Sequence, residues 1–78
     1  MSPKFDDIKE YRFYIHSNEE SRPHVHVRSE KKKAKVWLEP EIQLAENNGF
    51  SQKKINEIIK IVEENGNSFK TKFRAYIS

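Results

Sequence analysis

The sequence predicts an α+β fold, in which an antiparallel sheet of three or four strands packs one face against C-terminal helical segments. Two observations predict it: apolar and polar residues alternate between Tyr11 and Leu38, and apolar residues recur at helical spacing after Ser51. The chain has 78 residues, which is enough for one small hydrophobic core. Residues 1–10 show no sustained period, so we expect a flexible N-terminal arm there and a single domain over residues 11–78.

Three segments have the composition and alternation of β-strands: residues 11–16, 24–28 and 34–38. A polar stretch and then a charged stretch separate them, so the simplest arrangement is an antiparallel meander. Residues 42–45 follow Pro40 and fit either a short edge strand or a turn packed under the sheet.

The second half of the chain has a helical period. Ser51 is a favourable N-cap residue, and an apolar stripe follows it at Ile55, Ile58, Ile59 and Val62. Asn65, Gly66 and Asn67 are typical of a helix end, yet the spacing continues through Phe69, Phe73 and Tyr76. We expect two helical segments, 51–64 and 68–76, either collinear or bent at Gly66, with these three aromatic residues in the core.

Composition limits where the protein acts and what it binds. The chain has no cysteine, no apolar run near the roughly 18 residues of a membrane-spanning helix and no apolar signal-peptide core, so we expect a cytoplasmic protein without membrane contact. Six basic residues and one acidic residue lie between Arg22 and Lys35. This block favours an anionic partner, either RNA or an acidic protein, although Lys31–Lys33 are equally typical of a solvated hairpin tip.

Alternation on the strands predicts which face is core. The alternate strand positions that include Phe13, Val25 and Val36 are apolar, so we expect them on the core face. All three histidines, two aromatic residues and three cations then lie on the opposite face. We expect the helices to leave this face uncovered. Its residues are Arg12, Tyr14, His16, His24, His26, Arg28, Lys35 and Trp37.

Single-stranded RNA binding is the leading function for this face. Tyr14 and Trp37 would stack on bases, while cations would meet phosphates. The candidate cations are Arg12, Arg22, Arg28 and Lys35. His24 and His26 are candidates for general acid and base in metal-free phosphodiester cleavage, and the sequence does not separate cleavage from binding.

Two alternatives belong to other classes. His16, His24 and His26 have a spacing that permits a transition-metal site, such as zinc, in a hydrolase or nuclease. Tyr14 and Trp37 are also typical of the buried centre of a homodimer or of a complex with another protein.

Three motifs carry a resemblance to a known family: S-R-P-H-V-H-V at 21–27, A-K-V-W-L at 34–38 and N-G-F at 48–50. Together they resemble the small bacterial family known as domain of unknown function 4160. Its signature falls on Pro23, His24, Val25, His26, Val27, Ala34, Lys35, Trp37, Leu38 and Pro40. Arg22 and Val36 depart from the pattern, where the family usually has Pro and Phe.

The resemblance has an implication for biological role. Members of the family are often predicted in toxin–antitoxin-like gene pairs, and no activity is established for them. By this resemblance the protein is a toxin–antitoxin-like component that binds RNA or a cognate, acidic protein partner.

Overall fold

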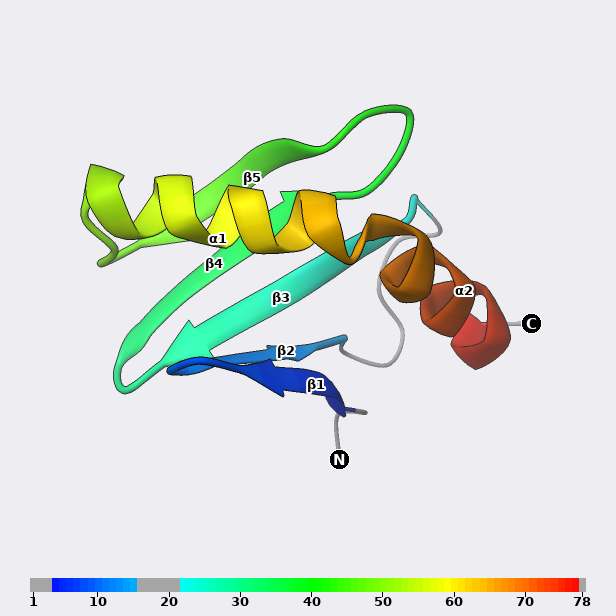
Figure 1. Ribbon diagram of the computed structural model, residues 1–78, viewed down its shortest axis with the longest axis horizontal. Coiled ribbons are helices and arrows are strands. Elements are labelled where there is room, and N and C mark those ends of the chain that lie inside the picture. The colour runs from blue at the N-terminus through cyan, green and yellow to red at the C-terminus, as the bar shows by residue number, and fades with distance from the viewer. Residues whose placement is uncertain (1–3, 16–21, 78) are drawn as a thin grey trace.

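The structure is a computed structural model that describes residues 4–15 and 22–77. It consists of one five-stranded antiparallel sheet in the order β1-β2-β3-β4-β5, followed by two helices (Figure 1). The elements are β1 (Lys4–Ile8), β2 (Tyr11–Tyr14), β3 (His24–Ser29), β4 (Lys32–Trp37), β5 (Gln43–Asn48), α1 (Gln52–Glu64) and α2 (Gly66–Ile77). The predicted α+β fold is confirmed, with five strands in place of three or four.

The additional strand is β1, at the position where we predicted a flexible arm. Lys4–Ile8 pairs with β2 in antiparallel register, with Ile8 opposite Tyr11. Its composition includes two aspartates and shows no sustained alternation, which is why the pattern did not predict a strand. Pairing with a neighbouring strand supplies the hydrogen bonds that the isolated segment lacks. Residues 4–8 therefore form a strand, where we predicted a flexible arm.

The segment after Pro40, for which the sequence allowed an edge strand or a turn, forms the edge strand β5. A bulge at Ala45 separates two registers, because Lys35 lies opposite Glu46 while Val36 lies opposite Leu44. Gly49 then connects β5 to α1 with a φ of 108°, in the left-handed region that favours glycine.

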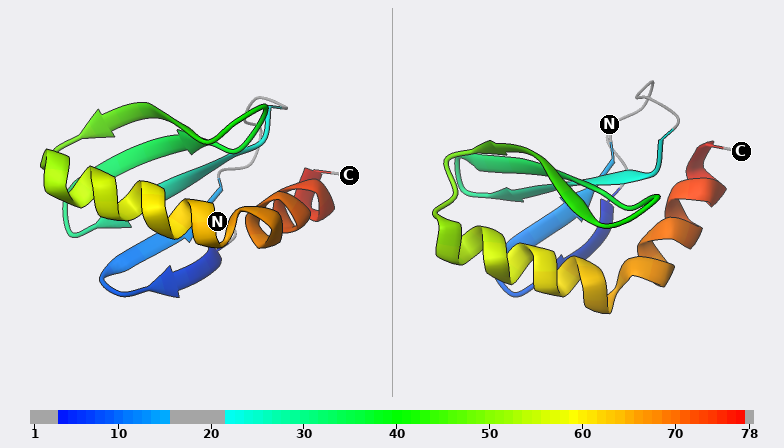
Figure 2. Two further views of the ribbon diagram at one scale, coloured as in Figure 1. Left: turned by 45° about the horizontal axis from the view of Figure 1, so that its top comes forward. Right: turned by 90° about the horizontal axis from the view of Figure 1, so that it is seen from above.

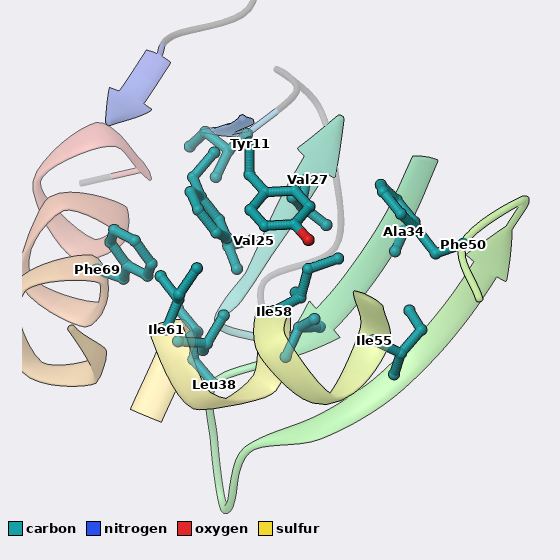
Figure 3. Packing of buried hydrophobic residues seen from close by; sticks show 14 of the residues in the cluster. Tyr11, Val25, Val27, Ala34, Leu38, Phe50, Ile55, Ile58, Ile61 and Phe69 are labelled. Atoms are coloured by element: carbon teal, nitrogen blue, oxygen red, sulfur yellow. The ribbon is translucent and has the colours of Figure 1, made fainter. Parts of the chain in front are cut away.

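The core lies between the sheet and α1 (Figure 3). Val25 and Val27 from β3 have no exposed surface, and Ile58 and Val62 of α1 are likewise fully buried. Ser51 caps α1 because its Oγ accepts a hydrogen bond from the backbone N–H of Lys54 at 3.3 Å. The predicted N-cap and the predicted core face of the strands are therefore both confirmed.

The chain bends at Asn65 and Gly66, so α1 and α2 are not collinear. Asn65 closes α1 by donating from Nδ2 to the carbonyl oxygen of Ile61 at 2.8 Å. α1 lies along one face of the sheet, whereas α2 rises past the ends of the strands (Figure 2, right view). Phe69 and Phe73 are buried as predicted, but Tyr76 is 39% exposed, because the last turn of α2 has passed the core. Neither described helix is long and apolar enough to cross a membrane.

Candidate functional site

The sheet face opposite α1 carries most of the predicted site residues, and we call it the outer face. Strand register aligns its side chains in rows that run across the sheet. One row consists of Arg12, Arg28 and Lys33, which lie directly opposite one another on β2, β3 and β4. We call these three residues the cationic row. All three side chains are exposed.

The cationic row is only partly neutralised. Arg12 Nε lies 3.4 Å from Asp7 Oδ1 on β1. Arg28 Nε donates to the backbone carbonyl oxygen of Glu30 at 3.3 Å, which is an uncharged acceptor. Among the described residues, no carboxylate forms an ion pair with Arg28 or Lys33. Like charges directly opposite on neighbouring strands are destabilising, so this arrangement costs the folded state free energy.

An aromatic pair lies in the neighbouring row. Tyr14 and His26 are cross-strand partners, and their rings stack with centroids 5.5 Å apart and an interplanar angle of 22°. Burial raises the pKa of the Tyr14 hydroxyl, and the positive charge of Arg28 opposes that shift. The Tyr14 hydroxyl is therefore protonated at neutral pH and can donate a hydrogen bond.

Lys35 and Trp37 do not offer the surfaces that we predicted. Lys35 is only 8% exposed, and its Nζ lies 4.5 Å from the ring centroid of Trp37. The guanidinium carbon of Arg22 lies 4.1 Å from the same ring. Both cations are attracted to the electron-rich ring faces. The Trp37 ring is thus already in contact with two cations, where the prediction had it available for bases.

His24 is the main correction on this face. It alternates with Val25 as predicted, but it has no exposed surface, because α2 brings the Phe73 ring to a centroid distance of 5.2 Å. The His26 and Trp37 rings lie at 5.2 and 5.9 Å. The prediction that the helices leave the whole face uncovered is therefore wrong at His24.

The hydrogen bonds of His24 define its tautomer. Its Nδ1 lies 2.7 Å from the carbonyl oxygen of Arg22, and since a carbonyl oxygen only accepts, Nδ1 carries the hydrogen and donates. Nε2 is buried and has no hydrogen-bond partner in the described parts of the chain. A ring without exposed atoms does not reach a substrate, so His24 packs the fold in this conformation, and its catalytic role stays a prediction.

The predicted metal site is only partly described. His16 lies outside the described residues, so its distance to His24 and His26 is not defined. Within residues 4–15 and 22–77, no group of three His, Asp or Glu side chains is arranged to hold a metal ion. The zinc alternative therefore stays a prediction.

A shallow pocket of about 260 Å³ lies on the outer face beside the cationic row, and we call it the outer pocket. Tyr14 and His26 line it together with residues that the sequence reasoning did not select: Lys33, Glu46 and Asn48. Continuing the alternation back from Lys35 would have placed Lys33 on this face. Glu46 could not be placed in the same way, because the bulge at Ala45 shifts the register.

A second polar cluster lies between the β1–β2 hairpin and α1. The Tyr11 hydroxyl donates to Glu57 Oε1 at 2.6 Å, and Lys9 Nζ lies 3.0 Å from Glu57 Oε2. The Tyr11 hydrogen bond and, after it, the one from Lys9 lower the pKa of Glu57. Burial and the nearby Glu57 raise the pKa of Tyr11. Because these groups pair with one another, the cluster joins the hairpin to α1.

Comparison with known families shows which family contains this chain. The model of the family described as Domain of unknown function (DUF4160) matches residues 11–74, which include every described outer-face residue named above except Asp7. The chain belongs to the DUF4160 family. Comparison with curated proteins gave no match, and comparison with solved structures gave none either. The DUF4160 match covers the sheet from β2 onward, α1 and most of α2, so the cationic row and the outer pocket lie within the family domain.

Proposed function

We propose that this DUF4160 protein binds single-stranded RNA across the uncovered end of its outer face. The observation that carries the proposal is the cationic row, in which Arg12, Arg28 and Lys33 lie opposite one another and exposed. Such a row raises the free energy of the folded protein. A polyanion that neutralises it would recover that cost and release counterions.

The neighbouring aromatic pair supports a single strand over a duplex. Bases of single-stranded RNA are exposed and stack on aromatic side chains, at about 1–3 kcal/mol per base. The Tyr14–His26 pair lies in the row next to Arg28 and Lys33, so a phosphate and its base can be contacted together. We place stacking on Tyr14 and His26, and no longer on Trp37.

An acidic protein is the second candidate for the same surface. The exposed charges of the cationic row fit a carboxylate-rich partner as well as a phosphate chain. This candidate corresponds to the cognate partner in a toxin–antitoxin-like pair, a role that the family resemblance implies. A partner on this surface would compete with RNA. If the surface serves only the partner, the isolated protein does not bind RNA, so an RNA titration separates the two candidates.

A salt-dependent titration tests the proposal. Wild-type protein is titrated into a labelled oligouridine of about ten nucleotides at several KCl concentrations. In Lys33→Ala, the slope of log affinity against log salt should fall by about 0.7, the value for one phosphate contact on a single strand. Lys60→Ala is the matched control, because it removes the same charge from an exposed position on α1.

Three results decide between the alternatives. A slope that falls only in Lys33→Ala supports RNA binding at the cationic row. Equal changes in both lysine variants would contradict a localised site, because they would show a response to net charge alone. No binding by the wild type at low salt would overturn the RNA proposal and favour the acidic partner.

A further inference from the structure

The outer pocket has a chemical asymmetry that RNA binding in general does not require. Register aligns Tyr14, His26, Lys35 and Glu46 in one row across β2, β3, β4 and β5. An aromatic pair therefore lies at one side of the pocket and a carboxylate at the other. Adjacent strands are about 4.8 Å apart, so two strand spacings separate His26 from Glu46. Lys35 lies between them in the same row, and the outer pocket of about 260 Å³ that these residues line has room for a planar ring.

Glu46 is an acidic residue that lies beside the cationic row, and no cation in residues 4–15 or 22–77 forms an ion pair with it. Its cross-strand partner is Lys35, but the Lys35 ammonium lies over the Trp37 ring, 4.5 Å from its centroid. The Glu46 carboxylate is exposed, and within the described residues it has no ion pair or hydrogen bond. Beside a site for phosphates, such a carboxylate repels the backbone of a nucleic acid. Its presence is explained if it contacts a base.

The chemistry of a carboxylate selects among the four bases. An ionised carboxylate only accepts hydrogen bonds, through two oxygens side by side. Guanine presents two adjacent donors, N1–H and N2–H, on its Watson–Crick edge. Adenine, cytosine and uracil each place acceptors next to their single donor group on that edge. Since single-stranded RNA is read on this edge, a lone carboxylate favours guanine.

We propose that the outer pocket binds a guanine base of single-stranded RNA, with Glu46 accepting hydrogen bonds from N1–H and N2–H. The base stacks against the Tyr14–His26 pair. Lys33, which also lines the pocket, donates to guanine O6 or to the adjacent phosphate. This inference rests on the proposed RNA binding and specifies the base that the site reads.

The test compares oligonucleotides that differ at one base. A short labelled oligouridine carries guanosine, inosine, adenosine or cytidine at its centre, and affinity is measured by fluorescence anisotropy. Inosine lacks only the N2 amino group of guanosine. Wild-type protein should bind the guanosine oligonucleotide roughly tenfold more tightly than the adenosine or cytidine ones, with inosine between them.

Two matched variants localise the effect. Glu46→Gln keeps the size of the side chain but replaces one acceptor with a donor, so the preference for guanosine should disappear while binding to oligouridine stays or tightens. Glu63→Gln makes the same change at an exposed position on α1 and should keep the full preference.

Each remaining outcome overturns a defined part of the inference. Equal, salt-sensitive binding of all four oligonucleotides by the wild type would exclude the guanine site and leave RNA binding in place. A preference for guanosine that persists in Glu46→Gln would exclude Glu46 as the reader. No binding of any oligonucleotide by the wild type would overturn the proposed function itself.

Discussion

The two ends of the outer face share one alternating pattern and differ in accessibility. At the end near the start of β3, His24 is fully buried and the Trp37 ring contacts two cations. At the other end, Arg28 and Lys33 are exposed. Strand alternation decides the face on which a side chain lies, but the elements that cross the sheet decide whether it can be reached.

The bend between the helices creates this difference. α2 rises past one end of the strands (Figure 2). Its Phe73 ring therefore reaches His24, and Arg74 forms a salt bridge with Glu39 in the loop after β4. Arg22 Nε donates to the carbonyl oxygen of the same Glu39 at 2.8 Å. The covered end is therefore part of the packing of the protein, and the RNA binding that we propose lies at the uncovered end.

The largest expected effect on stability comes from removing the Phe73 ring that covers His24. Phe73→Ala deletes a side chain that is 1% exposed, and we expect it to lower the free energy of unfolding by about 3–4 kcal/mol. Tyr76→Ala on the same helix removes a partly exposed ring and should cost less than about 1 kcal/mol. Urea denaturation measures both, and similar losses would show that α2 does not pack on His24 in solution.

The two histidines of β3 allow a direct test on one strand. His24→Ala leaves a cavity among three aromatic rings and should lower stability by about 2 kcal/mol. His26→Ala removes a half-buried ring at the outer pocket and should cost less than about 1 kcal/mol, while weakening RNA binding. Thermal unfolding and anisotropy give the two readouts. Weakened RNA binding by a folded His24→Ala variant, but not by His26→Ala, would reverse our assignment of the two ends.

Two tyrosines on β2 extend the comparison to both faces of the sheet. The hydrogen bond from Tyr11 lowers the pKa of Glu57 in the folded protein. This hydrogen bond therefore stabilises the fold fully above the unfolded glutamate pKa, about 4.3, and the stabilisation is lost as the pH falls through the lowered folded-state pKa. The stability difference between wild type and Tyr11→Phe should therefore be largest near neutral pH and shrink on acidification. Urea midpoints from neutral to acidic pH measure it.

Tyr14→Phe is the control for that experiment. It removes the same hydroxyl from the outer face, where burial raises the Tyr14 pKa above its ordinary value and the positive charge of Arg28 opposes the rise, so the hydroxyl does not titrate in the acidic range. Its effect on stability should not change over the acidic range. An equal pH dependence in both variants would show that Glu57 is not the titrating group.

The smallest stability effect is expected at the cationic row. Arg28→Ala relieves repulsion from Arg12 and Lys33, so stability should change by less than about 0.5 kcal/mol or rise slightly. Arg74→Ala also deletes an exposed arginine, but one that pairs with Glu39, and it should cost up to about 1 kcal/mol. A large loss in Arg28→Ala would mean that the row serves stability, which would remove the argument for an anionic ligand.

Much of the fold could be predicted because local pattern determines it. Alternation in β3 and β4 identified the core face through Val25, Val27 and Val36, and Ser51 identified the start of α1. β1 could not be predicted, because its strand conformation depends on pairing with β2 and not on its own composition. Tyr11 was not recognised as core, since its polar end is satisfied only by Glu57, which is distant in sequence.

The candidate site was predicted less completely than the fold. The row of Arg12, Arg28 and Lys33 follows from register, and alternation had already placed two of its members on one face. The burial of His24 depends on the direction that α2 takes after Gly66, which the helical period does not specify. Glu46 depends on the bulge at Ala45, which shifts the register by one residue and leaves no signal in the pattern.

The most direct test of the central claim is amide chemical-shift mapping by NMR with a short single-stranded RNA. We predict that the largest shifts occur at Arg12, Arg28, Lys33 and Glu46, with small changes at Lys60 and Glu64 on α1. Largest shifts on α1, or no shifts at RNA concentrations well above those of the protein, would contradict binding at the uncovered end of the outer face.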